Sequence, residues 1–139
     1  MRGRTVVLVV ISLLMLGLNS ASASTGPAKI AGRWFVTIQY KSPGDDDGNS
    51  TVWRATLKET KKGGLSGSSQ NVDTQCVTSV TGSVKRTTLT MTWKMKSAGC
   101  QAETIAFSKG VLSHGVIKGA CTDTQLGAAD YFMSQHGDG

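Results

Sequence analysis

Hydrophobic and polar residues alternate along most of the chain after residue 31, in short runs separated by polar, glycine-containing turns. Such alternation is typical of β-strands with one buried and one solvated face. The connections are shorter than the dozen or more residues that a parallel crossover needs, so we expect neighbouring strands to be antiparallel. The pattern predicts eight strands, at residues 32–40, 51–59, 64–70, 76–84, 88–95, 101–108, 111–121 and 128–134.

The alternation also assigns one face of the strands to the core. We expect the apolar members to point inward: Trp34, Val36, Ile38, Tyr40, Trp53, Ala55, Leu57, Leu89, Met91, Trp93 and Met95. Their polar neighbours suit a wet outer face. Closing eight strands into a barrel removes the exposed edges of an open sheet. The predicted fold is therefore all-β, an eight-stranded antiparallel up-and-down meander barrel, with a two-sheet β-sandwich as the alternative.

The first 23 residues have the pattern of a signal peptide. Arg2 and Arg4 precede an apolar run at residues 6–18, and Ala21-Ser22-Ala23 then offers a cleavage site with small residues. We predict a mature, secreted or periplasmic β-barrel domain at residues 24–139, without a membrane span. Loss of the two arginines lowers the formal net charge from +6 to +4. That charge is mild for a nucleic-acid-binding protein, so we expect no nucleic-acid partner.

Consecutive turns of a meander alternate between the two ends of the barrel. One end, the predicted mouth, then collects five acidic residues: Asp45, Asp46, Asp47, Asp73 and Asp123. The other end collects five basic residues: Lys61, Lys62, Lys85, Arg86 and Lys109. Trp34 lies near the basic end, where the chain enters the first strand. We expect it to close that end.

Three cysteines fall at the acidic end in this arrangement. A turn at Lys109-Gly110 would place Cys100 opposite Cys121, which predicts a disulfide between them. A Cys76–Cys100 disulfide also fits, and the sequence alone does not choose between the two. Either pairing leaves one thiol. A metal site of the three thiolates with His114 has no spacing typical of zinc sites, so we expect no metal and no cofactor.

Several short motifs resemble the calycin-type barrels, above all the avidins. "GRW" at residues 32–34 is similar to the G-x-W opening of lipocalins and avidins. The run from Cys76 through "VTGSV" and "LTMTWKM" to Cys100 and "ETIAFSKG" is similar to a run in bacterial avidin-like proteins. The resemblance implies a secreted barrel fold. It also implies biotin as an alternative ligand, with Trp93 stacking on the biotin ring.

The residues that would bind the ureido group of biotin depart from the avidin pattern. Ser69 stands where the family usually has a tyrosine, and Val36 where it has an asparagine. An unmet buried polar group costs about 1–3 kcal/mol, so these departures predict against tight biotin binding. Tyr40 also replaces a small hydroxyl residue.

The sequence gives little support to catalysis. Ser113 and His114 are adjacent in a predicted strand, where their side chains would point to opposite faces. We expect Glu103 and Asp130 to form a carboxylate pair only if the barrel brings them together. No phosphate loop or nucleophile elbow is present. We predict that the protein is not an enzyme.

Two functions from different classes remain. The first is a binder of a small neutral or cationic apolar ligand in the open end of the barrel, lined by Tyr40, Trp53, Ser69, Met91, Trp93 and Met95. Small residues expected inside, among them Gly67, Gly82 and Gly119, favour it because they leave room. The second is an interaction or inhibitor protein whose disulfide-linked loops dock onto a basic protein. Phe35 and Val52, apolar at outward positions, further predict a homo-oligomer.

Overall fold

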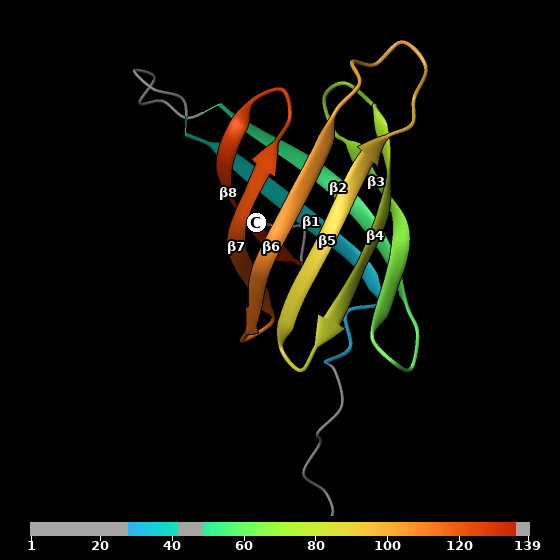
Figure 1. Cartoon of the computed structure of the whole chain (residues 1–139), viewed down its shortest axis with the longest axis vertical. Coiled ribbons are helices and arrows are strands. Elements are labelled where there is room, and N and C mark those ends of the chain that lie inside the picture. Colours follow the sequence, from blue (N-terminus) through green and yellow to red (C-terminus); the bar gives the residue numbers. More distant parts are fainter. Residues whose placement is uncertain (1–27, 42–48, 136–139) are drawn as a thin grey trace, which may run out of the picture.

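The computed structural model describes residues 28–41 and 49–135 of the chain. The predicted signal peptide and the aspartates at positions 45–47 lie outside these residues. The described part consists of eight strands joined by turns (Figure 1). They are β1 (Gly32–Tyr40), β2 (Ser50–Glu59), β3 (Gly64–Asn71), β4 (Val77–Lys85), β5 (Thr88–Met95), β6 (Thr104–Ser113), β7 (Val116–Asp123) and β8 (Gly127–Ser134).

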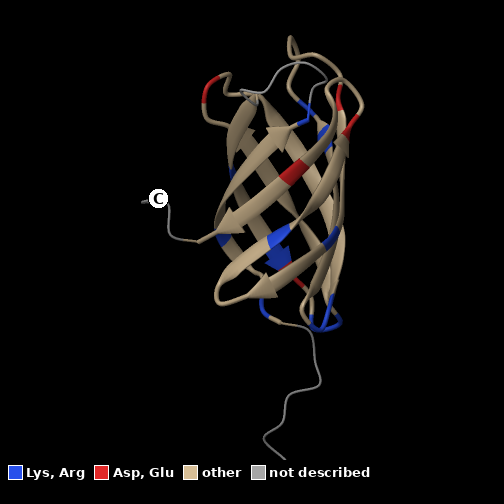
Figure 2. Cartoon of the chain, turned by 90° about the vertical axis from the view of Figure 1, so that its left-hand side faces the viewer, with Lys and Arg blue, Asp and Glu red and all other residues tan. Residues whose placement is uncertain are grey.

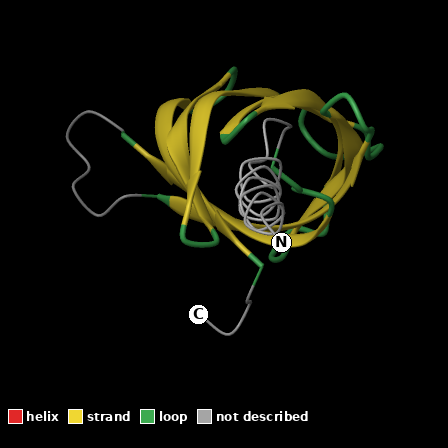
Figure 3. Cartoon of the chain, turned by 90° about the horizontal axis from the view of Figure 1, so that it is seen from below, coloured by secondary structure: helices red, strands yellow, loops and turns green. Residues whose placement is uncertain are grey.

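The strands form a closed barrel in sequence order, and every neighbouring pair is antiparallel. Figure 3, seen along the barrel, shows the strands closing around a single axis. Closure is made by β1 and β8, whose register runs from Phe35 opposite Ser134 to Tyr40 opposite Ala129. The predicted all-β meander barrel is confirmed. Within the described residues, no helix is long and apolar enough to cross a membrane.

The turn between β6 and β7 lies elsewhere than predicted. His114 (φ 53°) and Gly115 (φ 78°) form it, because both adopt the left-handed conformation that a tight turn requires. Lys109 (φ 46°) and Gly110 instead form an irregularity inside β6, where the register with β7 shifts. A side chain at Gly110 would begin 2.0 Å from the Tyr131 hydroxyl, so only glycine fits there. The Lys-Gly pair is therefore a β-bulge that resembles a turn in sequence.

The predicted inward faces are confirmed. All eleven residues expected inside are buried except Met95, which is half-buried and packs against the core. Core side chains from other strands join them: Leu65, Val80, Val84, Ile105, Phe107, Ile117, Cys121, Ala129, Tyr131 and Met133. Burial of this apolar area supplies the main driving force for folding.

The lower end of the barrel is defined by the turns at residues 60–63, 86–87 and 114–115, and the chain enters β1 at this end (Figure 1). The N–H of Ala28 donates to the Arg86 carbonyl at 2.7 Å, which joins the entering chain to the turn after β4. Trp34 is 2% exposed and its indole N–H donates to the Ile30 carbonyl at 2.7 Å. The Ile30 N–H donates in turn to Oε1 of Glu59. Trp34 is therefore buried near this end, as the prediction that it closes the end requires.

Basic residues gather at the same end (Figure 2). Lys61 and Lys62 lie in the turn after β2, and Lys85 and Arg86 lie where β4 turns into β5. Lys109 does not belong to this set, because it lies in the bulge of β6 rather than in a turn. The turns at residues 72–76, 96–103 and 124–126 lie at the upper end, where β1 ends and β2 begins.

Candidate functional site

The ligand-binding residues predicted from the sequence lie inside the barrel, where they pack on one another. Tyr40, Trp53, Ser69, Met91 and Trp93 are each 3% exposed or less. Four rings form a continuous row: Trp53 and Trp93 have centroids 5.4 Å apart, Trp93 and Phe107 4.5 Å, and Phe107 and Tyr131 4.8 Å. These distances are those of packed aromatic pairs, so the row fills the middle of the barrel.

The polar groups of this set are also occupied within the protein. The indole N–H of Trp53 donates to the Thr51 hydroxyl at 2.9 Å. The indole N–H of Trp93 donates to the sulfur of Met91 at 3.3 Å. The hydroxyls of Ser69 and Thr78 bond each other. A ligand in the interior would have to replace these contacts.

The small interior residues serve close packing, and the expectation that they leave room for a guest is wrong. A Cβ atom at Gly67 would lie 2.0 Å from the Thr56 carbonyl oxygen, and one at Gly82 would lie 2.7 Å from Cβ of Met91. A Cβ atom at Gly119 would lie 2.9 Å from Tyr131. Each glycine therefore allows a neighbour to approach closely.

The upper end of the barrel contains a cluster of Tyr40, Glu103 and Asp123, in which Tyr40 and Asp123 are buried and Glu103 is half-buried. Asp123 was expected among the exposed mouth charges, but it is 2% exposed. Its Oδ2 accepts a 2.7 Å hydrogen bond from the Tyr40 hydroxyl, and its Oδ1 accepts one of 2.8 Å from the main-chain N–H of Gln125. A buried carboxylate needs hydrogen-bond donors, and the Tyr40 hydroxyl and the Gln125 N–H supply them. Asp123 thereby links the turn after β7 to the interior of the barrel. Sequence pattern does not show this, because an aspartate before a turn is equally typical of an exposed loop.

Ionisation of this cluster is strongly perturbed. Burial, the charge of Asp123 and a hydrogen bond with the Asp123 side chain together raise the pKa of Glu103 to about 7. Burial and the Asp123 carboxylate also raise the pKa of Tyr40 far above its ordinary value. Glu103 therefore changes charge near neutral pH. Asp130, which the sequence offered as the partner of Glu103, lies instead on the outer face and pairs with Lys41 at 3.3 Å.

The predicted ring of negative charge at the upper end is only partly present among the described residues. Asp73 is exposed in the turn after β3, as expected. Lys41 and Lys96 lie at the same end, so its described charges have both signs. Asp45, Asp46 and Asp47 lie outside the described residues.

The disulfide joins Cys76 to Cys100, with Cα atoms 6.1 Å apart, and Cys121 is a buried free cysteine. The Cys100–Cys121 pairing is therefore wrong and the alternative is right. The true β6–β7 turn at His114-Gly115 places Phe107 opposite Cys121, while Cys100 lies in the loop before β6. Burial raises the pKa of the Cys121 thiol to about 12, so it is unreactive in the folded protein.

Ser113 and His114 do contact each other, at 3.0 Å between Oγ and Nδ1. The prediction that they point apart is wrong, because His114 lies in a left-handed turn and not in a strand. Both residues are exposed at the lower end. Within the part of the chain that the structure describes, no three His, Cys, Asp or Glu side chains are grouped to hold a metal ion.

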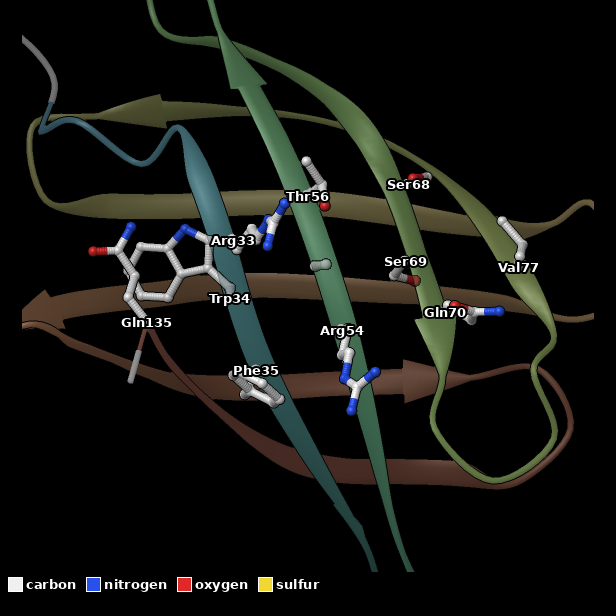
Figure 4. Close-up of a pocket in the computed structure, with 11 residues that line it drawn as sticks. Arg33, Trp34, Phe35, Arg54, Thr56, Ser68, Ser69, Gln70, Val77 and Gln135 are labelled. Atoms are coloured by element: carbon white, nitrogen blue, oxygen red, sulfur yellow. The ribbon is translucent and has the colours of Figure 1, made fainter. Parts of the chain in front are cut away.

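A groove of about 610 Å³ crosses the outer wall of β1, β2 and β3 (Figure 4). Strand register explains its shape. Phe35, Arg54, Gln70 and Val77 face one another across β1 to β4 and form a row in which three long side chains precede a valine. The next row consists of Arg33, Thr56, Ser68 and Ser79, in which three short hydroxyl side chains follow one long cation. The short row beside the long row leaves the hollow.

The groove is positively charged. Arg33 and Arg54 line it with Phe35, and its lining contains no carboxylate. The guanidinium of Arg54 lies 5.9 Å from the centre of the Phe35 ring, a cation–π geometry seen in Figure 4. Within residues 28–41 and 49–135, neither arginine has a salt bridge. The sequence pattern did not predict this site, because outward polar residues such as Arg33 and Arg54 were assigned to a solvated outer face.

Comparison with known proteins gives no relative: no family model, no curated protein and no solved structure matches the chain. The closed eight-stranded meander agrees with a calycin-type barrel in its coarse architecture.

Proposed function

We propose that this chain is a non-enzymatic binding protein that binds an anionic partner in the groove across β1 to β3. The observation that carries the proposal is that Arg33 and Arg54, which have no salt bridge within the described residues, lie beside Phe35 in a groove lined without carboxylates. Guanidinium groups bind carboxylates, sulfates and phosphates through paired hydrogen bonds. The aromatic row that fills the interior supports an external site over an internal one.

An NMR titration with polyanions tests this proposal. Polyglutamate and polygalacturonate are added separately to isotopically labelled protein, and backbone amide shifts are followed. We expect the changes to gather at residues 33–35, 54–56 and 68–70, and to shrink in Arg33→Gln and Arg54→Gln. Lys118→Gln is the control, since Lys118 is an exposed cation on the outer face of β7. Changes confined to the upper loops, or equal in all variants, would contradict the proposal.

Docking of a basic protein through the upper loops is a second candidate. The Cys76–Cys100 disulfide favours it, since it ties the loop before β4 to the loop before β6 and makes both rigid. Asp73 is an exposed acidic residue beside this link. Under this candidate, Asp73→Asn weakens binding of a basic protein probe such as lysozyme, while Arg54→Gln does not.

The cavity ligand and the avidin-like identity remain predictions of the sequence. For either, Trp93 would have to leave the packed row in which it is 0% exposed. Secretion also remains a prediction, and sequencing the N-terminus of the exported protein tests it. A disulfide in the mature protein fits an oxidising compartment.

A further inference from the structure

We infer that the anionic partner is an oligosaccharide that bears carboxylate or sulfate groups and lies across the strands of the outer wall. This inference rests on the proposed function and adds the chemical class of the ligand. It follows from the side chains that continue the groove beyond β3, from the aromatic platform inside it, and from the closure of the barrel.

The short row of the groove continues across two more strands. Ser79 on β4 faces Lys94 on β5, so the row reads Arg33, Thr56, Ser68, Ser79, Lys94. Adjacent strands are about 4.8 Å apart, which places the two cations about 19 Å apart along the wall with a hydroxyl on each strand between them. β1 and β5 lie on opposite sides of the closed barrel, so the row follows the curve of the wall. A flexible chain that bends around the wall, with anionic groups and hydrogen-bonding groups between them, would match this row.

A second row below it has the same chemistry. Lys58 faces Ser66, which faces Thr81, which faces Thr92. Over the described strands β1 to β5, the outward positions contain no Asp or Glu. The wall therefore combines hydroxyls with cations and lacks the carboxylates that would repel an anion.

Hydroxyl side chains suit a sugar in particular. Serine and threonine hydroxyls both donate and accept hydrogen bonds, and sugar hydroxyls do the same. Gln70 adds an amide at the edge of the groove, and its side chain is held by hydrogen bonds to Gln75 at 3.0 and 3.3 Å. Gln135 adds a second amide near the other end of the lining.

Phe35 supplies a platform for the apolar face of a sugar ring. Its ring is half-buried and lies beside Arg54 on the neighbouring strand (Figure 4). A sugar stacked on Phe35 would bring a carboxylate or sulfate within reach of Arg54. The aromatic ring and the guanidinium would then recognise different parts of one ligand.

The fold disfavours two other anions. An extended acidic peptide gains affinity mainly by pairing with an open sheet edge, and the closed barrel offers none. An amphipathic helix needs a continuous apolar groove, whereas two arginines and several hydroxyl side chains interrupt the apolar lining here. Single-stranded nucleic acid needs a series of aromatic platforms, and Phe35 is the single aromatic side chain on the outward face of the described β1 to β5.

Isothermal titration calorimetry on the full mature chain tests the inference. The probes are a heparin hexasaccharide, a galacturonic acid hexamer, neutral maltohexaose, hexaglutamate and a short single-stranded DNA. We expect binding of at least one of the anionic sugars, weakened at least fivefold by Arg54→Gln and by Phe35→Ala, with Lys118→Gln unchanged. Binding should weaken as salt rises, because the contacts are exposed ion pairs.

The outcomes separate the inference from the proposed function. If hexaglutamate or DNA binds more tightly than both anionic sugars, and Arg54→Gln weakens that binding, the proposed function stands and the sugar assignment is overturned. If no anion binds, or if Arg33→Gln and Arg54→Gln leave binding unchanged, both are overturned. Far-ultraviolet circular dichroism checks that each variant is folded. We expect both arginine variants to fold, because Arg33 and Arg54 are exposed.

Discussion

The hydroxyl of Tyr40, at the end of β1, donates a 2.7 Å hydrogen bond to Asp123, at the end of β7. The two residues are 83 positions apart in sequence, and β8 lies between their strands in the barrel. Both side chains are buried, so the bond joins two walls of the upper end from the inside. The bond also orients the Asp123 carboxylate, whose other oxygen accepts a hydrogen bond from the Gln125 N–H in the turn after β7.

Tyr40→Phe should therefore destabilise the protein by about 1–3 kcal/mol, because Asp123 would stay buried with one donor fewer. Tyr131→Phe is a matched control. The Tyr131 hydroxyl is buried and has no hydrogen-bond partner in the described part of the chain, so its removal should cost little or stabilise the fold. Urea unfolding of both variants measures the difference. Equal losses in the two would contradict the assigned role of Tyr40.

Stability should fall as the pH rises from about 4.5 to about 7, because Glu103 titrates across this range. Its raised pKa means that the folded state binds the proton more tightly than the unfolded state, so deprotonation favours unfolding. Partial exposure limits the effect to about 1 kcal/mol. Glu103→Gln should remove this part of the pH dependence. An unchanged profile in the variant, measured by urea unfolding at several pH values, would assign the effect to another group.

Most of the fold could be predicted from the alternation of hydrophobic and polar residues, since each strand has one face in the core and one face toward solvent. It also set the boundaries of β1 and β5 at the residues observed. It did not separate a bulge from a turn at Lys109-Gly110, because both use glycine and a left-handed residue. That one shift misplaced β6, β7 and the disulfide.

The candidate site was harder to predict from the sequence. The positions of Arg33 and Arg54 on neighbouring strands depend on register, which the long connection between β1 and β2 does not fix. Burial of Asp123 depends on Tyr40 reaching it across β8, a contact between distant residues. Inward tryptophans in alternating strands give the same sequence pattern in a filled barrel and in a hollow one. The contacts between the side chains in the structure are needed to distinguish the two.

The cysteine assignment predicts distinct thiol reactivity in the folded and the denatured protein. The oxidised folded chain should not react with Ellman's reagent, because Cys121 is buried and its pKa is raised to about 12. Denaturation should expose one thiol per chain. Reduction should lower the free energy of unfolding by about 2–4 kcal/mol. Peptide mapping that found Cys100 linked to Cys121 would contradict the structure.

Trp93 should behave as a core residue. Trp93→Ala should cost about 3–5 kcal/mol, since it removes the ring that contacts both Trp53 and Phe107. Biotin should leave the intrinsic tryptophan fluorescence of the folded protein unchanged at submicromolar concentration. A saturable change with biotin would establish an interior ligand site and support the avidin resemblance at the level of function.

Self-association should occur through the outer face of β8, β1 and β2. Phe132, Thr37 and Val52 face one another across these strands, and Phe132 is 47% exposed. An exposed phenylalanine close to the half-buried Val52 on one wall is typical of contact surfaces, so we expect a dimer at micromolar concentration in sedimentation velocity. Phe132→Asp should give monomers, whereas Leu126→Asp, which removes a side chain that is 49% exposed in an upper turn, should not. A monomeric wild-type chain would contradict this interface, and equal dissociation by both variants would place the contact elsewhere.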